Sequence, residues 1–183
     1  MIRAIITDFD GTLVDTFDAN LKAYQKAFGE VGVVLSEEKY RECFGFRFDR
    51  FMEVMGISEK ETIVRIKSLK KDYYPLFFES LHPNDALIEL IRSFKCFGGK
   101  TAIASTARKE NLINVLKYLG IVDLFDLIYT GQDVENGKPS PEIYDKTMAE
   151  LQVQPTDTLI FEDSEVGLQA AKASGAYFIK ITF

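Results

Sequence analysis

The chain has 183 residues, of which 46% are hydrophobic and 27% charged, a composition typical of a folded globular domain. Its net charge of -6 argues against a general attraction to nucleic acid or to an anionic membrane surface. The two cysteines, Cys43 and Cys96, form no CxxC pair, which favours free thiols in a reducing compartment. No apolar stretch is long enough to cross a bilayer, so we expect a cytoplasmic protein, with a monomer as the default state.

Short apolar segments alternate with amphipathic helical patterns along most of the chain. The β-branched run at residues 2–7 predicts a buried parallel strand, and further strands are expected at residues 101–105, 127–129, 158–161 and 177–182. Helices are predicted at residues 85–94, 110–119, 141–151 and 164–174, the last with Ser164 as its N-cap. This alternation predicts an α/β fold, a Rossmann-like three-layer core in which helices cover both faces of a parallel sheet.

Residues 17–80 depart from this alternation. Phe17, Leu21, Tyr24 and Phe28 recur at helical spacing, and further helices are predicted at residues 36–43, 48–55 and 58–74. We therefore expect a small α-helical domain, residues 16–80, inserted after the first strand of a core made of residues 1–15 and 81–183. Thr16 and residues 75–81 bracket the insert and are candidate hinges.

Two aspartates follow the first strand directly, in the segment Asp8-Phe9-Asp10-Gly11-Thr12. Gly11 permits a turn that would direct both carboxylates into one crevice. Carboxylates held close together repel each other unless a cation or a shared proton relieves them, and Mg²⁺ prefers such oxygen ligands. Taken alone, the pair also fits an ordinary solvated turn, because Asp and Gly are common turn residues.

Groups that suit phosphate occur at two later positions. Ser105 and Thr106 end a predicted strand, where a hydroxyl and backbone N–H groups can bind phosphate oxygens. Lys138 lies between a glycine and a proline just before a predicted helix, where its charge can hold phosphate and offset that of Asp8. Each also has an ordinary alternative, as a helix cap or as a surface lysine.

Acidic residues follow the strand predicted at residues 158–161. Asp163 could complete a metal site begun by Asp8, with Glu162 as a second ligand or an outer-shell partner. The alternative is that Asp163 or Ser164 only caps the next helix. Because ligands bind beyond the carboxyl ends of parallel strands, we expect Asp8, Ser105 and Asp163 to converge at one edge of the sheet.

The order of these four motifs resembles that of the haloacid dehalogenase-like hydrolase superfamily, in particular the branch containing β-phosphoglucomutase and phosphoglycolate phosphatase. The matching segments are residues 5–16, 103–106, 137–141 and 160–175, which together span the core. The resemblance implies a phosphatase that hydrolyses a small phosphorylated metabolite with Mg²⁺ as its cofactor. It also implies that the helical insert is a cap that closes over the site and selects the substrate.

The resemblance also implies roles for individual residues. Asp8 would be the nucleophile that forms an aspartyl-phosphate, and Asp10 the acid–base group. The phosphate-binding residues would be Ser105, Thr106 through its amide, and Lys138. The metal ligands would be Asp8, the backbone carbonyl of Asp10, and Asp163, with Glu162 nearby.

Two residues of the insert, Asn20 and Arg47, are candidate specificity residues. Asn20 stands where the mutase branch resembles D-T-x-x-x-H, with a histidine in the first cap helix, which weakens a mutase assignment. Arg47 could reach the far end of a substrate, whereas Arg50 is interpreted as a solvated helix residue. The only histidine, His82, is predicted to be a turn residue in the second linker.

Three alternatives to a phosphatase remain open at this point. A phosphomutase of the β-phosphoglucomutase type would use the same phosphorylated Asp8 but pass the phosphoryl group to a sugar phosphate instead of water. A signalling domain would keep phosphorylated Asp8 as a switch, although the helical insert and Asp10 argue against it. An inactive binding domain would keep the fold alone, which the complete set of motif residues disfavours.

Overall fold

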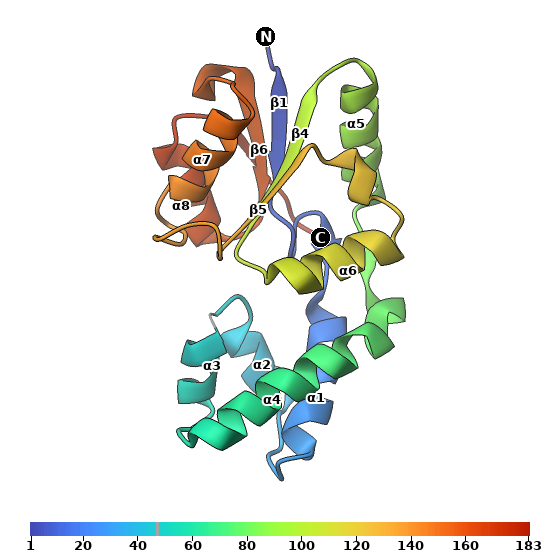
Figure 1. Cartoon of the computed structure of the whole chain (residues 1–183), viewed down its shortest axis with the longest axis vertical. Coiled ribbons are helices and arrows are strands. Elements are labelled where there is room, and N and C mark those ends of the chain that lie inside the picture. Colours follow the sequence, from blue (N-terminus) through green and yellow to red (C-terminus); the bar gives the residue numbers. More distant parts are fainter. Residues whose placement is uncertain (47) are drawn as a thin grey trace. The chain divides into compact units, whose positions relative to one another are not determined.

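A computed structural model describes residues 1–46 and 48–183, and it divides the chain into two compact units. The first unit comprises Met1–Asp15 and His82–Phe183, and the second comprises Thr16–Leu81. The first is an α/β unit with a parallel sheet and the second is entirely helical, so the predicted fold class is confirmed (Figure 1). No helix in the described part of the chain is long and apolar enough to span a membrane.

The sheet of the α/β unit has five strands in the order β5-β4-β1-β6-β7. Its strands are β1 (Ala4–Thr7), β4 (Lys100–Ser105), β5 (Leu127–Thr130), β6 (Thr158–Glu162) and β7 (Tyr177–Lys180). All neighbours are parallel, and Thr7 at the end of central β1 lies opposite Ile103 of β4 and Phe161 of β6. The chain builds outward from β1 first on one side and then on the other. The carboxyl end of β1 is therefore a topological switch point, where open α/β sheets bind ligands.

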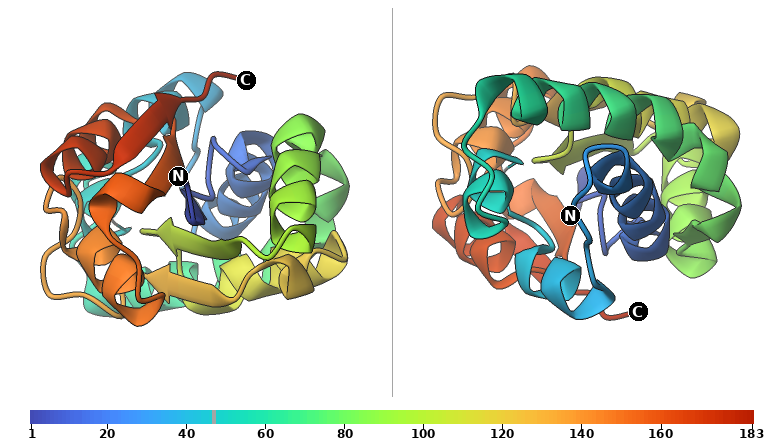
Figure 2. Two further views of the ribbon diagram at one scale, coloured as in Figure 1. Left: turned by 90° about the horizontal axis from the view of Figure 1, so that it is seen from above. Right: turned by 90° about the horizontal axis from the view of Figure 1, so that it is seen from below.

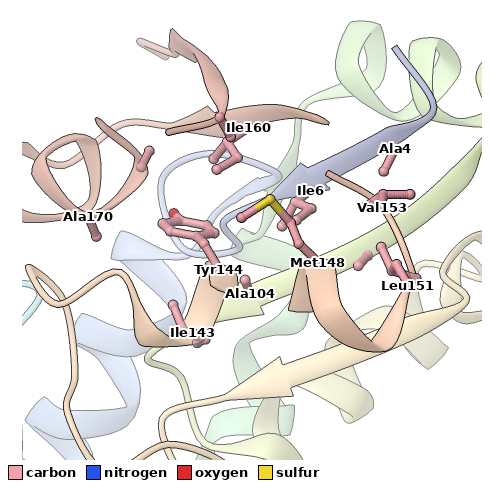
Figure 3. Close-up of a cluster of buried hydrophobic side chains, with 13 residues drawn as sticks. Ala4, Ile6, Ala104, Ile143, Tyr144, Met148, Leu151, Val153, Ile160 and Ala170 are labelled. Carbon is pink, nitrogen blue, oxygen red and sulfur yellow. The ribbon is translucent and has the colours of Figure 1, made fainter. Parts of the chain in front are cut away.

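Helices cover both faces of this sheet. They are α5 (Asp85–Cys96), α6 (Lys109–Tyr118), α7 (Glu142–Glu150) and α8 (Glu165–Ala173). The 3₁₀ turns η2 (Val122–Leu124) and η3 (Pro155–Asp157) precede β5 and β6. Helices α7 and α8 lie on one face and α5 on the other (Figure 1, Figure 2). Alternate residues of the strands, including Ala4, Ile6 and Ile160, form a core cluster with α7 and α8 (Figure 3). As predicted, the Ser164 hydroxyl caps α8 by accepting a hydrogen bond from the Gly167 N–H.

A short antiparallel ribbon pairs the segment by which the chain leaves the α/β unit with the segment by which it returns. Strand β2 (Val14–Asp15) pairs with β3 (His82–Pro83), with Asp15 opposite His82. The prediction of His82 as a turn residue is therefore wrong. Two-residue strands carry no periodic pattern, and this pairing depends on segments 67 positions apart meeting in space, which local sequence cannot indicate.

The last strand, β7, lies at the edge of the sheet. Among the described residues it pairs with β6 alone, and all four of its residues are exposed. Its apolar residues therefore reflect pairing in the sheet and not burial on both faces.

The helical unit contains α1 (Phe17–Gly29), α2 (Glu37–Cys43), α3 (Phe48–Val54), α4 (Lys60–Tyr73) and the 3₁₀ segment η1 (Tyr74–Ser80). Its own core is aromatic, with Phe28, Tyr40 and Phe51 buried and the Phe51 ring 5.1 Å from that of Tyr24. The segment proposed as the second hinge, residues 75–81, is mostly the 3₁₀ turn η1, which kinks at Phe77. The unit therefore holds together by contacts within itself.

Candidate active site

A tight loop after β1 holds the two motif aspartates. The Asp8 N–H donates to the Phe161 carbonyl at 2.9 Å, which continues the β1–β6 pairing one residue beyond the strand. The next residues then turn sharply, with the N–H groups of Leu13 and Val14 both donating to the Phe9 carbonyl. Gly11 has a φ of +83°, a conformation that side chains disfavour, so the glycine makes this turn possible. The loop places Asp8 at the switch point of the sheet.

Lys138 reaches into the same place from the segment before α7. Its ammonium group donates to Asp8 Oδ1 at 2.7 Å and to Glu162 Oε1 at 2.6 Å. The side chains of Lys138 and Glu162 are almost entirely buried, at 3% and 1% exposure. The alternative reading of Lys138 as a surface lysine is therefore wrong. Removing Lys138 would leave two buried carboxylates without the cation that compensates them.

Burial and the neighbouring charges have opposite effects on the pKa values of Asp8 and Lys138. Burial raises the pKa of Asp8 from 3.8 to about 7, although the charge of Lys138 opposes that rise. Burial by itself would lower the pKa of Lys138, but the neighbouring Asp8, Tyr144 and Glu162 outweigh it and hold that pKa well above 10.5. Lys138 thus stays charged. The ionised form of Asp8 is destabilised by desolvation, and an additional cation would stabilise it.

Glu162 is held by protein groups at both of its carboxylate oxygens. Oε1 accepts from Lys138 and, at 3.4 Å, from the Tyr144 hydroxyl, while Oε2 accepts from the Ser164 N–H and hydroxyl. Gly167 of α8 leaves room for this carboxylate, because a Cβ at that position would lie 1.7 Å from Glu162 Oε1. Of the two roles left open for Glu162, this geometry favours the outer-shell partner over the metal ligand.

Asp163 faces the loop that follows β1. Its Oδ1 accepts a hydrogen bond from the Thr12 hydroxyl at 2.7 Å. A Cβ on Gly11 would lie 2.5 Å from Asp163 Oδ2, so this glycine also makes the close approach of the carboxylate possible. Burial raises the pKa of Asp163, as it does for Asp8. Asp163 is therefore a second partly desolvated carboxylate at the edge where Asp8 lies.

The donors at this edge fit Mg²⁺. Within residues 1–46 and 48–183, no three Asp, Glu, His or Cys side chains converge as a complete metal cluster. Mg²⁺ does not require one, because it is commonly bound by one or two carboxylates together with water and substrate phosphate. Asp8 uses Oδ1 for Lys138 and Asp163 uses Oδ1 for Thr12, which leaves Oδ2 of each as the oxygen suited to a cation.

The predicted phosphate-binding hydroxyl lies on the neighbouring strand. Ser105 ends β4 and is 1% exposed, and its hydroxyl accepts a hydrogen bond from the Ala107 N–H at 3.1 Å. The next residue, Thr106, is exposed. Since Ile103 lies opposite Thr7, Ser105 at the end of β4 and Asp8 just after β1 lie at the same edge of the sheet.

The candidate specificity residues belong to the helical unit. Asn20 lies in the first turns of α1 and is half-buried, and its N–H donates to the Thr16 carbonyl. Arg47 lies outside the described residues. Arg50 is exposed and pairs with Glu53 on its own helix, in agreement with its interpretation as a solvated helix residue.

Sequence reasoning did not identify Thr12 and Tyr144 as parts of the site. Thr12 lies inside the first motif, but its contact with Asp163 joins residues 151 positions apart. Tyr144 lies on α7, in a position that the helical pattern marks only as apolar. A tyrosine at a fully buried helix position is a signal in the sequence that could have been used, because a buried hydroxyl needs a partner.

Comparisons with known proteins agree with this geometry. The family model described as haloacid dehalogenase-like hydrolase matches residues 5–181. The phosphorylated carbohydrates phosphatase of Thermotoga maritima is 29% identical over 177 residues, covering 95% of this chain and 82% of that protein. The β-phosphoglucomutase of Bacillus subtilis is 26% identical over 190 residues, covering 98% and 83%.

Solved structures show the same fold over the whole length. The crystal structure of CbbY from Rhodobacter sphaeroides in complex with phosphate superimposes with a TM-score of 0.89 at 28% sequence identity, covering 100% of this chain and 87% of that one. The match extends over both units of the chain and includes every motif of the α/β unit. The chain thus belongs to the haloacid dehalogenase-like hydrolases, in the branch that contains β-phosphoglucomutase and phosphoglycolate phosphatase.

Proposed function

We propose that this protein is a Mg²⁺-dependent phosphatase that hydrolyses a small phosphorylated metabolite through an aspartyl-phosphate intermediate on Asp8. The observation that carries the proposal is the buried contact of 2.7 Å between Lys138 and Asp8 at the switch point of the sheet. A carboxylate paired with a cation at this position can meet a phosphate dianion without prohibitive repulsion. The similarity to a phosphorylated carbohydrates phosphatase supports the substrate class.

In the proposed first half-reaction, a carboxylate oxygen of Asp8 attacks phosphorus in line with the leaving oxygen. The bond from Asp8 to phosphorus forms as the bond to the leaving oxygen breaks, and Asp10 donates a proton to that oxygen. In the second half-reaction Asp10 takes a proton from water, which attacks phosphorus and releases inorganic phosphate and free Asp8. Each cycle thus returns both aspartates to their starting protonation states.

The remaining site residues bind and neutralise charge. Lys138, the Ser105 hydroxyl and the Thr106 amide bind phosphoryl oxygens, which gain negative charge as the transfer proceeds. Mg²⁺, when bound, would neutralise charge on the phosphate and on Asp8. Asp8, the Asp10 carbonyl and Asp163 would hold it, with Glu162 as an outer-shell partner that orients Lys138.

We assign the chemistry to the unit of residues 1–15 and 81–183 and substrate selection to a cap of residues 16–80. The structure divides the chain at nearly the same positions, between Asp15 and Thr16 and between Leu81 and His82. Asn20 and Arg47 are proposed to contribute to selection from the cap. The two free cysteines suit a reducing compartment, and we further propose that the enzyme is cytoplasmic and monomeric.

A phosphomutase is the second candidate, favoured by the similarity to β-phosphoglucomutase. It would use the same Asp8 intermediate, and the difference lies in the acceptor of the phosphoryl group. The mutase branch carries a histidine where this chain has Asn20, which favours water as the acceptor here. Free phosphate release measured against isomerised sugar phosphate separates the two reactions.

The proposal is tested with p-nitrophenyl phosphate and a panel of phosphorylated sugars and other small metabolites, each with Mg²⁺ and with EDTA. We expect Mg²⁺-dependent phosphate release that Asp8→Asn abolishes, and slower formation and hydrolysis of the intermediate in Asp10→Asn. Undiminished turnover by Asp8→Asn would refute the mechanism. A phosphorylated Asp8 that persists without turnover would instead support a signalling role.

A further inference from the structure

Tyr144 introduces a hydroxyl group into a core cluster that is otherwise apolar. Its neighbours in that cluster are alanine, isoleucine, leucine, valine and methionine side chains, and the tyrosine itself is fully buried (Figure 3). If the ring only filled space, phenylalanine would serve as well and would bury no hydroxyl. The presence of a tyrosine therefore calls for a contact that uses its polar end.

The Tyr144 hydroxyl and ring contact the buried ion pair of Lys138 and Glu162. The hydroxyl donates to Glu162 Oε1 at 3.4 Å, and the ring centroid lies 5.1 Å from Lys138 Nζ. The oxygen that accepts from Tyr144 is the same one that accepts from Lys138. Tyr144 therefore contacts both the cation that pairs with Asp8 and the carboxylate that holds this cation.

Lys138 needs such neighbours because its side chain is flexible. A lysine head has three N–H donors on a four-carbon stem with many rotamers. Two of these donors go to Asp8 and Glu162, and the ring of Tyr144 lies beside the ammonium group. These neighbours together determine the orientation in which the ammonium group would meet a phosphoryl oxygen.

We propose that Tyr144 is a positioning residue of the phosphatase site, which fixes Glu162 with its hydroxyl and Lys138 with its ring so that the ammonium group stays aligned between Asp8 and phosphate. This proposal rests on the proposed function. It gives α7 a part in phosphoryl transfer, although no residue of that helix belongs to the motifs. Gly167 serves the same arrangement, because only glycine leaves room for the Glu162 carboxylate.

Tyr144→Phe is the sharpest test, since it keeps the ring and removes only the hydroxyl. We expect kcat to fall about threefold or more with KM little changed. A less well-positioned Lys138 would stabilise the transition state less, because negative charge develops on the phosphoryl oxygens during transfer. The matched control is Met148→Leu, which alters a buried residue of the same helix and cluster that has no polar contact with the site. The control should keep the wild-type kcat.

A second variant, Tyr144→Leu, removes the ring as well and should lower kcat by about a further threefold. A purely structural role predicts that Tyr144→Phe and Met148→Leu change kcat alike, in proportion to any loss of melting temperature, and that result would overturn the proposal. A wild-type kcat in Tyr144→Phe would overturn it too.

A binding measurement separates this proposal from the proposed function. Inorganic phosphate with Mg²⁺ is titrated into wild type and Tyr144→Phe, and the rise in melting temperature reports binding. If the wild type hydrolyses no phosphate ester, the proposed function fails, while weaker phosphate binding by Tyr144→Phe would still support the positioning of Lys138. Equal binding together with equal turnover would refute the role of Tyr144 alone.

Discussion

Asp8→Asn is expected to inactivate the enzyme and yet stabilise the metal-free protein. Burial raises the pKa of Asp8 from 3.8 to about 7 even though Lys138 lies beside it. An acid with a raised pKa in the folded state binds its proton more tightly there than in the unfolded chain. The contribution of Asp8 to the stability of the folded state is therefore largest below pH 3.8. It falls as the pH rises from 3.8 toward 7 and stays at the lower value at higher pH.

The size of the effect follows from the shift. A pKa unit corresponds to about 1.4 kcal/mol, so ionised Asp8 lowers the free energy of unfolding by about 4 kcal/mol above pH 7. Asparagine has a similar shape and no charge to desolvate. We expect Asp8→Asn to be about 4 kcal/mol more stable than wild type at pH 8 in EDTA, and nearly equal to it at pH 4.

Urea unfolding of both proteins at a series of pH values, always in EDTA, measures this difference. Asp126→Asn is a control of opposite sign, because the Asp126 pKa is lowered by hydrogen bonds from Lys95 and Thr101 that outweigh its partial burial. That variant should be less stable than wild type at pH 8, with a difference that shrinks in acid. If Asp8→Asn gave no gain at pH 8, or the same gain at pH 4, the argument from buried charge would be wrong.

Three further predictions concern the same edge of the sheet. Lys138→Met should lower kcat by about 100-fold or more, measured by phosphate release, because it removes the cation that faces the developing charge; a loss under tenfold would contradict its role. Gly11→Ala should weaken Mg²⁺ binding about tenfold or more, seen as a smaller thermal shift with the metal, because its Cβ would meet Asp163; unchanged binding would exclude Asp163 as a ligand. Wild-type Mg²⁺ affinity, measured by calorimetry, should fall about tenfold per pH unit below pH 7, because the metal needs ionised Asp8 and the proton competes with it; a flat profile down to pH 5 would refute this.

Much of the α/β unit could be predicted because its signals are local. Apolar runs and helical spacing identified every strand of the main sheet, and Ser164 was identified as a cap from its place before a helix. The motif residues could be located because each follows a predicted strand or precedes a predicted helix, and parallel strands end at a common edge. Asp8, Ser105 and Asp163 lie at that edge in the structure, as this rule predicts.

Other features depend on contacts between distant parts of the chain. The pairing of Asp15 with His82 leaves no periodic trace in either segment. Glu162 could be read equally well as a metal ligand or as an outer-shell partner until the structure showed both of its oxygens bound by protein donors. For Tyr144 the local pattern predicted only burial.

The α/β class, the order of the motifs and the kinds of groups available for chemistry follow from periodicity and residue type, so they can be inferred from the sequence. How those groups share their hydrogen bonds depends on the tertiary structure. Lys138 and Asp8 are 130 positions apart, and their contact exists because the sheet brings the ends of its strands together. Burial at that point then raises the pKa of Asp8, a property that no single segment of the chain possesses.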